Sequence, residues 1–99
     1  ERLEVADVLL SDLAPNITGI REIDQTRSKD LCFRAYEIAS AVLRMNGNFL
    51  CKLFQGEESK ELVDVLHKEF DRVKIYKPQA SKKRSKEIYV VALGFNLPD

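Results

Sequence analysis

Four short apolar runs, rich in β-branched residues, are spaced along the chain and predict β-strands. The first run, Val-Ala-Asp-Val-Leu-Leu, is typical of a strand that is buried on both faces of a parallel sheet. It ends at Ser11–Asp12. The predicted strands span residues 5–10, 48–54, 73–76 and 88–95.

Between these runs, apolar residues recur at the three- and four-residue spacing of amphipathic helices. The first helix is predicted from about Arg27 to Met45, after a polar loop that runs to about Thr26. Asn46–Gly47 is a typical helix stop, because glycine accepts the left-handed conformation there. The second helix is predicted from about Glu58 to Phe70. The apolar stripes comprise Leu31, Ala35, Ile38, Ala39, Val42 and Leu43 in the first helix, and Leu62, Val63, Leu66 and Phe70 in the second.

The element order β-α-β-α-β-β predicts an α/β fold with a mostly parallel sheet and helices on its faces. The loop of about eleven residues before the last strand is too short for a parallel crossover, so that strand is predicted to be antiparallel. A strand buried on both faces needs two neighbours, yet the first predicted strand starts almost at residue 1. Four strands and two helices would expose a long apolar edge. We therefore expect residues 1–99 to form part of a single domain whose N-terminal half is absent from this chain.

Composition places the chain among globular proteins, since 44% of residues are hydrophobic and 32% are charged. No apolar run approaches the roughly 20 residues that span a bilayer, so we expect no membrane segment. Cys32 and Cys51 lie in apolar stretches and are expected to be reduced packing residues rather than a disulfide. We also expect no metal site, because His67 is the only histidine and no Cys-x-x-Cys spacing occurs.

The net charge is zero, but the charges are unevenly distributed. The rest of the chain holds nine basic and sixteen acidic residues. A run of one sign indicates either a solvated loop or a surface that binds a polyanion, and charge alone leaves both open. The segment from 72 to 86 contains no acidic residue and seven basic ones: Arg72, Lys74, Lys77, Lys82, Lys83, Arg84 and Lys86.

Lys52 is the most informative single residue, because every neighbour between Phe49 and Phe54 is apolar. A lysine is rarely buried without a partner. Its side chain either reaches solvent from the strand's end or is a functional ammonium at the carboxyl end of a parallel strand, where open α/β sheets bind ligands. Asp12 follows the first strand in the same way and is either a turn residue before a proline or a site carboxylate. Glu87 opens the last strand and indicates nothing by itself.

Three longer segments carry a resemblance to a known family. Residues 7–19, DVLLSDLAPNITG, resemble the DLVLSDMAPNxSG block of the RrmJ/FtsJ (RlmE-like) ribosomal RNA 2′-O-ribose methyltransferases. Residues 48–57, NFLCKLFQGE, are similar to the family's GNFLVKxFQGE block, and residues 77–89, KPQASKKRSKEIY, to its KPxASRxxSxExY block. The three blocks follow one another in family order and at family spacing, so the resemblance covers nearly the whole chain.

The resemblance implies the C-terminal half of a Rossmann-like methyltransferase fold that uses S-adenosyl-L-methionine. The family has a Lys-Asp-Lys-Glu catalytic tetrad. By motif position Asp12 matches its aspartate, Lys52 its second lysine and Glu87 its glutamate. Asp12 is also expected to face the cofactor. The first lysine and the glycine-containing cofactor turn lie in the family's N-terminal half, so we expect residues 1–99 alone to be inactive.

In the implied mechanism Lys52 orients and deprotonates the ribose 2′-hydroxyl, or stabilises the developing alkoxide if it stays charged. A free lysine has a pKa near 10.4, so a base must lose its proton more easily. Burial would lower the pKa of Lys52, whereas Asp12 and Glu87 would raise it, and the sequence leaves the balance open.

The implied partner is RNA, a uridine of the large ribosomal subunit, bound by a protein that is monomeric at full length. The compartment is intracellular: the cytoplasm in a bacterium, or a mitochondrion or other organelle in a eukaryote. The alternatives are a transfer RNA 2′-O-methyltransferase and a non-catalytic RNA-binding or interaction module. Phosphates would be gripped by the basic loop that comprises Lys82, Lys83, Arg84 and Lys86.

Overall fold

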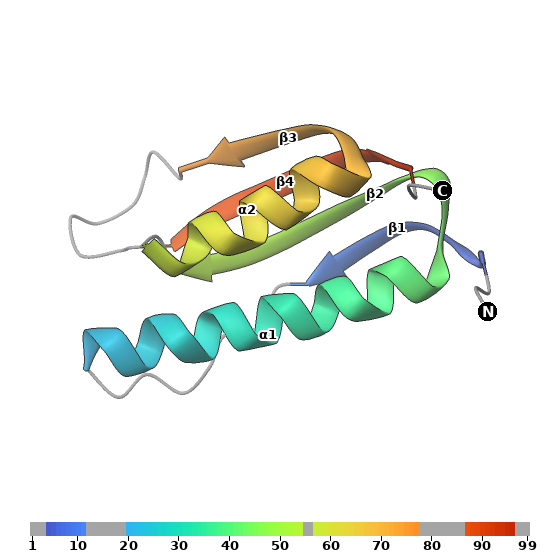
Figure 1. Ribbon diagram of the computed structural model, residues 1–99. Helices are drawn as coiled ribbons and strands as arrows, with labels where there is room; N and C mark the ends of the chain where they lie inside the picture. The colour runs from blue at the N-terminus through green and yellow to red at the C-terminus, as the bar shows by residue number, and fades with distance from the viewer. Residues whose placement is uncertain (1–3, 12–19, 55–56, 78–86, 97–99) are drawn as a thin grey trace.

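The chain folds into two layers, a four-stranded sheet with both helices on one face (Figure 1). The computed structural model describes residues 4–11, 20–54, 57–77 and 87–96. No helix in these ranges is both long enough and apolar enough to cross a membrane. The elements are β1 (Ala6–Ser11), α1 (Arg21–Val42), β2 (Leu43–Phe54), α2 (Glu57–Glu69), β3 (Phe70–Tyr76) and β4 (Glu87–Phe95).

The sheet is mixed, with strand order β1-β2-β4-β3. β1 and β2 pair in parallel, and β4 lies between β2 and β3 and is antiparallel to both. The α/β class, the order of the elements and the antiparallel last strand are therefore confirmed.

Helix α1 occupies a different span from the predicted one. The backbone N–H of Asp24 already donates to the carbonyl of Ile20 at 3.0 Å, so the helix begins inside the predicted polar loop. It ends at Val42, because Leu43 adopts an extended conformation and is completely buried in the core.

The Asn46–Gly47 pair lies inside β2 and is not a helix stop. Ala6 pairs with Leu43 and Val8 with Asn48, so β2 carries three more residues than β1 between these pairs. Asn46 takes up the excess with a left-handed backbone, φ 68°. Asn–Gly favours a positive φ, which can end a helix. Here the positive φ instead accommodates the extra residues of a strand irregularity.

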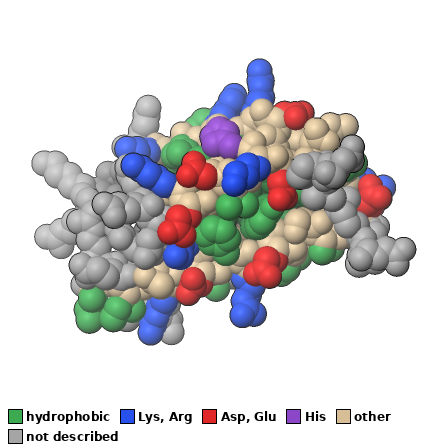
Figure 2. Space-filling view, in the orientation of Figure 1, with side chains coloured by type: hydrophobic (Ala, Val, Ile, Leu, Met, Phe, Trp, Pro, Cys, Tyr) green, Lys and Arg blue, Asp and Glu red, His purple; other side chains and the backbone are tan. Residues whose placement is uncertain are grey.

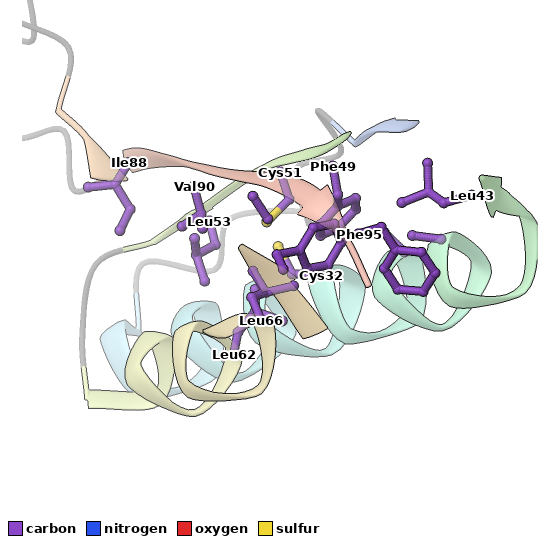
Figure 3. Packing of buried hydrophobic residues seen from close by; sticks show 14 residues of the cluster. Cys32, Leu43, Phe49, Cys51, Leu53, Leu62, Leu66, Ile88, Val90 and Phe95 are labelled. Carbon is purple, nitrogen blue, oxygen red and sulfur yellow. The ribbon is translucent and has the colours of Figure 1, made fainter. Parts of the chain in front are cut away.

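The core lies between the sheet and the helices (Figure 3). The buried positions of α1 are Asp24, Ser28, Cys32, Ala35 and Ala39. The predicted stripe of α1 is therefore partly wrong, since it included Ile38, which is 53% exposed in the described structure. The sheet contributes Phe49, Cys51, Leu53, Ile88, Val90, Ala92 and Phe95.

Helix α2 carries most of the predicted apolar stripe, with Leu62 and Leu66 completely buried. The prediction is wrong for Phe70, which is the first residue of β3 rather than the last of the helix. Two polar contacts join α2 to α1. The Tyr36 hydroxyl donates to the carboxylate of Glu69, and Lys29 pairs with Glu61 at 3.4 Å. The two helices therefore form one layer over the sheet, and acidic and basic side chains are interspersed on its surface (Figure 2).

β1 is the edge strand of the described sheet rather than a strand buried on both faces. Val8 is 53% exposed and Leu10 is 69% exposed. The prediction that β1 is buried on both faces is wrong for the described residues. The predicted apolar edge is present, because β1 exposes Val8 and Leu10 at the edge of the described sheet. Cys32 and Cys51 are free and buried, which confirms the prediction of reduced packing residues.

Candidate active site

The carboxyl ends of β1 and β2 lie beside the first residues of β4, at the same end of the strands (Figure 1). Because β4 runs antiparallel to β2, the chain enters β4 where β2 ends. Ser11, Lys52 and Glu87 come from these three strands. Open α/β sheets bind ligands at the carboxyl ends of their parallel strands, so this end of the strands is the candidate site.

Lys52 and Glu87 form an ion pair across β2 and β4. The Nζ atom of Lys52 lies 3.3 Å from Oε2 of Glu87. Phe54 is the register partner of Glu87, and Tyr89 is that of Lys52, so the pair is a diagonal contact on one face. The side chain of Lys52 is 18% exposed and that of Glu87 is 36% exposed. The ammonium is therefore largely covered but paired, rather than simply extended into solvent.

The helix layer fixes the backbone beneath this ion pair. Cys51 and Leu53 are buried against the helices. Side chains alternate along a strand, so Lys52 projects from the opposite face. The thiol of Cys32 in α1 donates a hydrogen bond to the carbonyl of Lys52 at 3.2 Å. Packing thus holds the strand, and the open face of the sheet presents the charge.

Asp12 lies outside the described residues. The residue before it, Ser11, is buried and pairs with Cys51, the residue before Lys52. The predicted RNA-binding residues also lie outside the described part of the chain: Lys82, Lys83, Arg84 and Lys86.

Tyr89 lies in the candidate site but has no distinctive local signal in the sequence. It lies directly opposite Lys52 in the antiparallel ladder and follows Glu87 by two positions. Residues two apart on a strand share a face, so the spacing of Glu87 and Tyr89 was the available signal. The register of β2 with β4 gives this spacing its meaning, because it places Lys52 beside Glu87 and Tyr89.

The described residues do not by themselves form a site for a sulfonium nucleoside. A hollow of about 300 Å³ lies between β1 and α1, but its lining is mainly aliphatic. Its one charged side chain, Arg34, would repel a sulfonium cation. Within the described ranges, no three His, Cys, Asp or Glu side chains are grouped to hold a metal ion. The lining residues of the hollow are Leu9, Leu10, Ser11, Leu31, Arg34, Ala35 and Ile38.

Known proteins resemble this chain in sequence and in structure. A protein of Methanosphaera stadtmanae named ribosomal RNA large subunit methyltransferase E is 50% identical over 90 residues, which cover 91% of this chain and 44% of that protein. A protein of the same name from Desulfotalea psychrophila is 42% identical over 91 residues, covering 92% of this chain and 45% of its own length. The chain therefore spans a little under half the length of these relatives.

The fold also matches a solved structure. A crystal structure described as a ribosomal RNA methyltransferase from Plasmodium falciparum superposes with a TM-score of 0.83 at 25% identity. The match covers 93% of this chain and 48% of that one. Residues 1–95 match the family described as FtsJ-like methyltransferase. The chain belongs to the FtsJ-like methyltransferase family.

Proposed function

We propose that the protein methylates the ribose 2′-oxygen of RNA, with a uridine of large-subunit ribosomal RNA as the substrate. The observation that carries this proposal is the ion pair of Lys52 and Glu87 at the carboxyl end of β2. Covering an ammonium costs free energy even when it is paired, and such groups cluster at functional sites. The names of the relatives support a ribosomal substrate.

A cation beside the reacting oxygen would favour this chemistry, because it stabilises the negative charge that develops there. In the transfer the 2′-oxygen attacks the methyl carbon in line. The O–C bond forms as the S–C bond of the methyl donor breaks, and the proton of the 2′-hydroxyl passes to a water molecule. The Glu87 carboxylate lies 3.3 Å from Nζ of Lys52, and opposite charges attract at that distance. We therefore assign Lys52 the stabilisation of the developing alkoxide and Glu87 the orientation of the ammonium.

The methyl donor is proposed to be S-adenosyl-L-methionine, which supplies an activated methyl group. Asp12 is proposed to face this donor and to help hold Lys52. The register of Ser11 with Cys51 supports that placement, since it sets the end of β1 beside the strand that carries Lys52. Most of the donor site is proposed to come from residues outside this chain.

The basic loop is proposed to grip RNA phosphates next to this site. Glu87 follows the loop directly in sequence, so RNA held there would lie near the ion pair. Phosphate contacts would position the substrate, while the 2′-hydroxyl distinguishes RNA from DNA. Such a substrate places the protein inside the cell. The proposed phosphate contacts are Lys82, Lys83, Arg84 and Lys86.

We further propose that residues 1–99 are the C-terminal part of one methyltransferase domain, whose remaining strands extend the sheet from β1. The exposed side chains of Val8 and Leu10 support this, because an apolar edge strand is an aggregation hazard. Residues 1–99 expressed alone should sediment as oligomers and exchange the β1 amides rapidly. A well-protected monomer would contradict this proposal.

The function is tested with the full-length protein and labelled S-adenosyl-L-methionine. We expect label in large ribosomal subunits, located by nuclease digestion and mass spectrometry on the 2′-oxygen of a uridine. A substrate with a 2′-deoxyuridine at the target should accept none. Transfer RNA is the comparison substrate, and methylation of it alone would support the transfer RNA alternative. RNA binding without any transfer would support the non-catalytic module and refute the proposed chemistry.

A further inference from the structure

Three exposed side chains alternate along the edge strand β3: Arg72, Lys74 and Tyr76. We call them the β3 stripe. In the ladder they face Leu93, Val91 and Tyr89 of β4. Consecutive members are two residues apart, which corresponds to about 6.7 Å along a strand. The stripe is thus a regular row of two cations and one phenol ring.

The stripe lies on the face of the sheet that the helices leave open. Val73, between two members of the stripe, pairs with Ala92, which is completely buried beneath the helices. Residues directly opposite each other share a face, so Val73 points toward the helices and its neighbours point away. Lys52 also projects from the open face. The stripe therefore belongs to the same surface as the ion pair of Lys52 and Glu87.

The positive charge of the stripe is not neutralised by the described part of the chain. Arg44, by contrast, has a carboxylate partner, since its Nε atom lies 3.3 Å from Oδ1 of Asp7. Neither Arg72 nor Lys74 forms an ion pair within the described ranges. Charge of one sign on an open surface attracts polyanions.

An aromatic row connects the stripe to the ion pair. Tyr76 is paired with Tyr89, and Tyr89 with Lys52, so the three lie side by side across β3, β4 and β2. Adjacent strands are about 4.8 Å apart, which places Tyr76 roughly 10 Å from the strand of Lys52. Tyr76 is 52% exposed, so its ring is accessible for stacking.

We propose that the β3 stripe binds a single-stranded segment of the RNA substrate beside the target nucleotide. Arg72 and Lys74 contact phosphates, and a base stacks on Tyr76. Stacking requires an unpaired base, which selects single-stranded over duplex RNA. This assignment rests on the proposed function. β3 lies at the opposite edge of the sheet from β1, so a sheet extended at β1 leaves the stripe accessible.

The charges are tested by replacing Arg72 and Lys74 together with Gln in the full-length protein. The control is the double variant Lys60→Gln with Lys68→Gln. It removes two exposed positive charges from α2, which covers the other face of the sheet from the stripe. The probe is a mixed-sequence single-stranded RNA oligonucleotide, and its Kd is measured across a salt series.

Each phosphate contact contributes about 0.7 to the log–log slope, so the stripe variant should lose roughly 1.4. With affinity at 1 M salt unchanged, that slope change corresponds to about 25-fold weaker binding at 0.1 M. The control should retain the wild-type slope. An unchanged slope in the stripe variant, or an equal loss in the control, would overturn the assignment.

The ring is tested with Tyr76→Ala and Tyr76→Phe. Loss of one stacked base should weaken single-strand binding by between about 5-fold and about 150-fold. Tyr76→Phe keeps the ring and should bind like wild type, and duplex RNA should show little difference among the three proteins. Equal binding by Tyr76→Ala and wild type would exclude the stacking role. Because binding is measured without methyl transfer, an inactive wild-type protein would refute the proposed function while these results still decide the stripe.

Discussion

Replacing Lys52 by Ala tests whether the ammonium at the end of β2 serves catalysis or only the fold. Removing one preorganised group that stabilises transition-state charge costs about 10²–10³ in rate, and removing a general base costs about 10²–10⁴. We therefore expect at least a 100-fold loss of methyl transfer in the full-length protein.

The structural cost of the same change should be small. Glu87 would lose its partner, but its side chain is 36% exposed and can be rehydrated. Ion pairs accessible to solvent contribute about 0.2–1 kcal/mol. This pair is partly covered, so the free energy of unfolding should fall by roughly 1–2 kcal/mol. A large catalytic loss with a small loss of stability is the expected combination.

Single-turnover transfer to large ribosomal subunits measures the first quantity, and denaturant unfolding measures the second. Lys60→Ala, which removes an exposed lysine from α2, is the matched control and should leave both unchanged. Lys52→Arg separates the two roles, because arginine keeps the charge but cannot accept a proton. Partial activity in Lys52→Arg supports charge stabilisation. Near wild-type turnover in Lys52→Ala would show that the lysine is structural and that the mechanism is wrong.

Three further predictions concern the core, the helix layer and the basic loop. Burial and the hydrogen bond to Glu69 raise the pKa of Tyr36, so the stabilisation from its protonated hydroxyl is fully present below pH 10 and should fade as the pH rises further. Unfolding of wild type and Tyr36→Phe as a function of pH checks it. The hydrogen bond with Cys32 and burial raise the pKa of Cys51, so iodoacetamide should not label it at pH 8 until the protein unfolds. Filter binding across a salt series should show a flatter slope, by about 0.7 per lost phosphate contact, when Gln replaces Lys82, Lys83 and Arg84 together.

The type and order of the elements could be predicted because hydrophobic periodicity reflects local geometry. The residues at which the elements begin and end could not be predicted, because they depend on burial in the folded core. Leu43 reads as the last residue of a helical stripe, yet the core draws it into β2. Asn46 accepts a left-handed backbone in a helix cap and in a strand irregularity alike, so its identity does not distinguish the two.

The candidate site could be predicted only as separate residues. Lys52 was conspicuous because its neighbours are apolar, whereas Glu87 gained a meaning only from the family resemblance. Their contact at 3.3 Å depends on the register of β2 with β4, and no local pattern specifies a register between strands 35 positions apart in sequence. The same register brings Tyr89 beside Lys52, which is why that residue was not singled out.

The apolar residues of α1 fall into two sets, and only one of them is covered by the described residues. One set, Cys32, Ala35 and Ala39, packs against the sheet, whereas Ile38 is 53% exposed and lines the hollow beside β1. If the rest of the domain covers that flank, Ile38 is a core residue of the full-length protein.

Ile38→Asn should then destabilise the full-length protein by roughly 2–3 kcal/mol, which is the cost of losing a buried aliphatic side chain. Ile75 provides the control, since it is 49% exposed on β3 at the opposite edge of the sheet. Ile75→Asn should change the free energy of unfolding by no more than about 0.5 kcal/mol. Denaturant unfolding of both variants measures the difference. Equal changes in the free energy of unfolding would mean that nothing covers the flank of α1. The edge strand β1 would then remain exposed to solvent in the full-length protein.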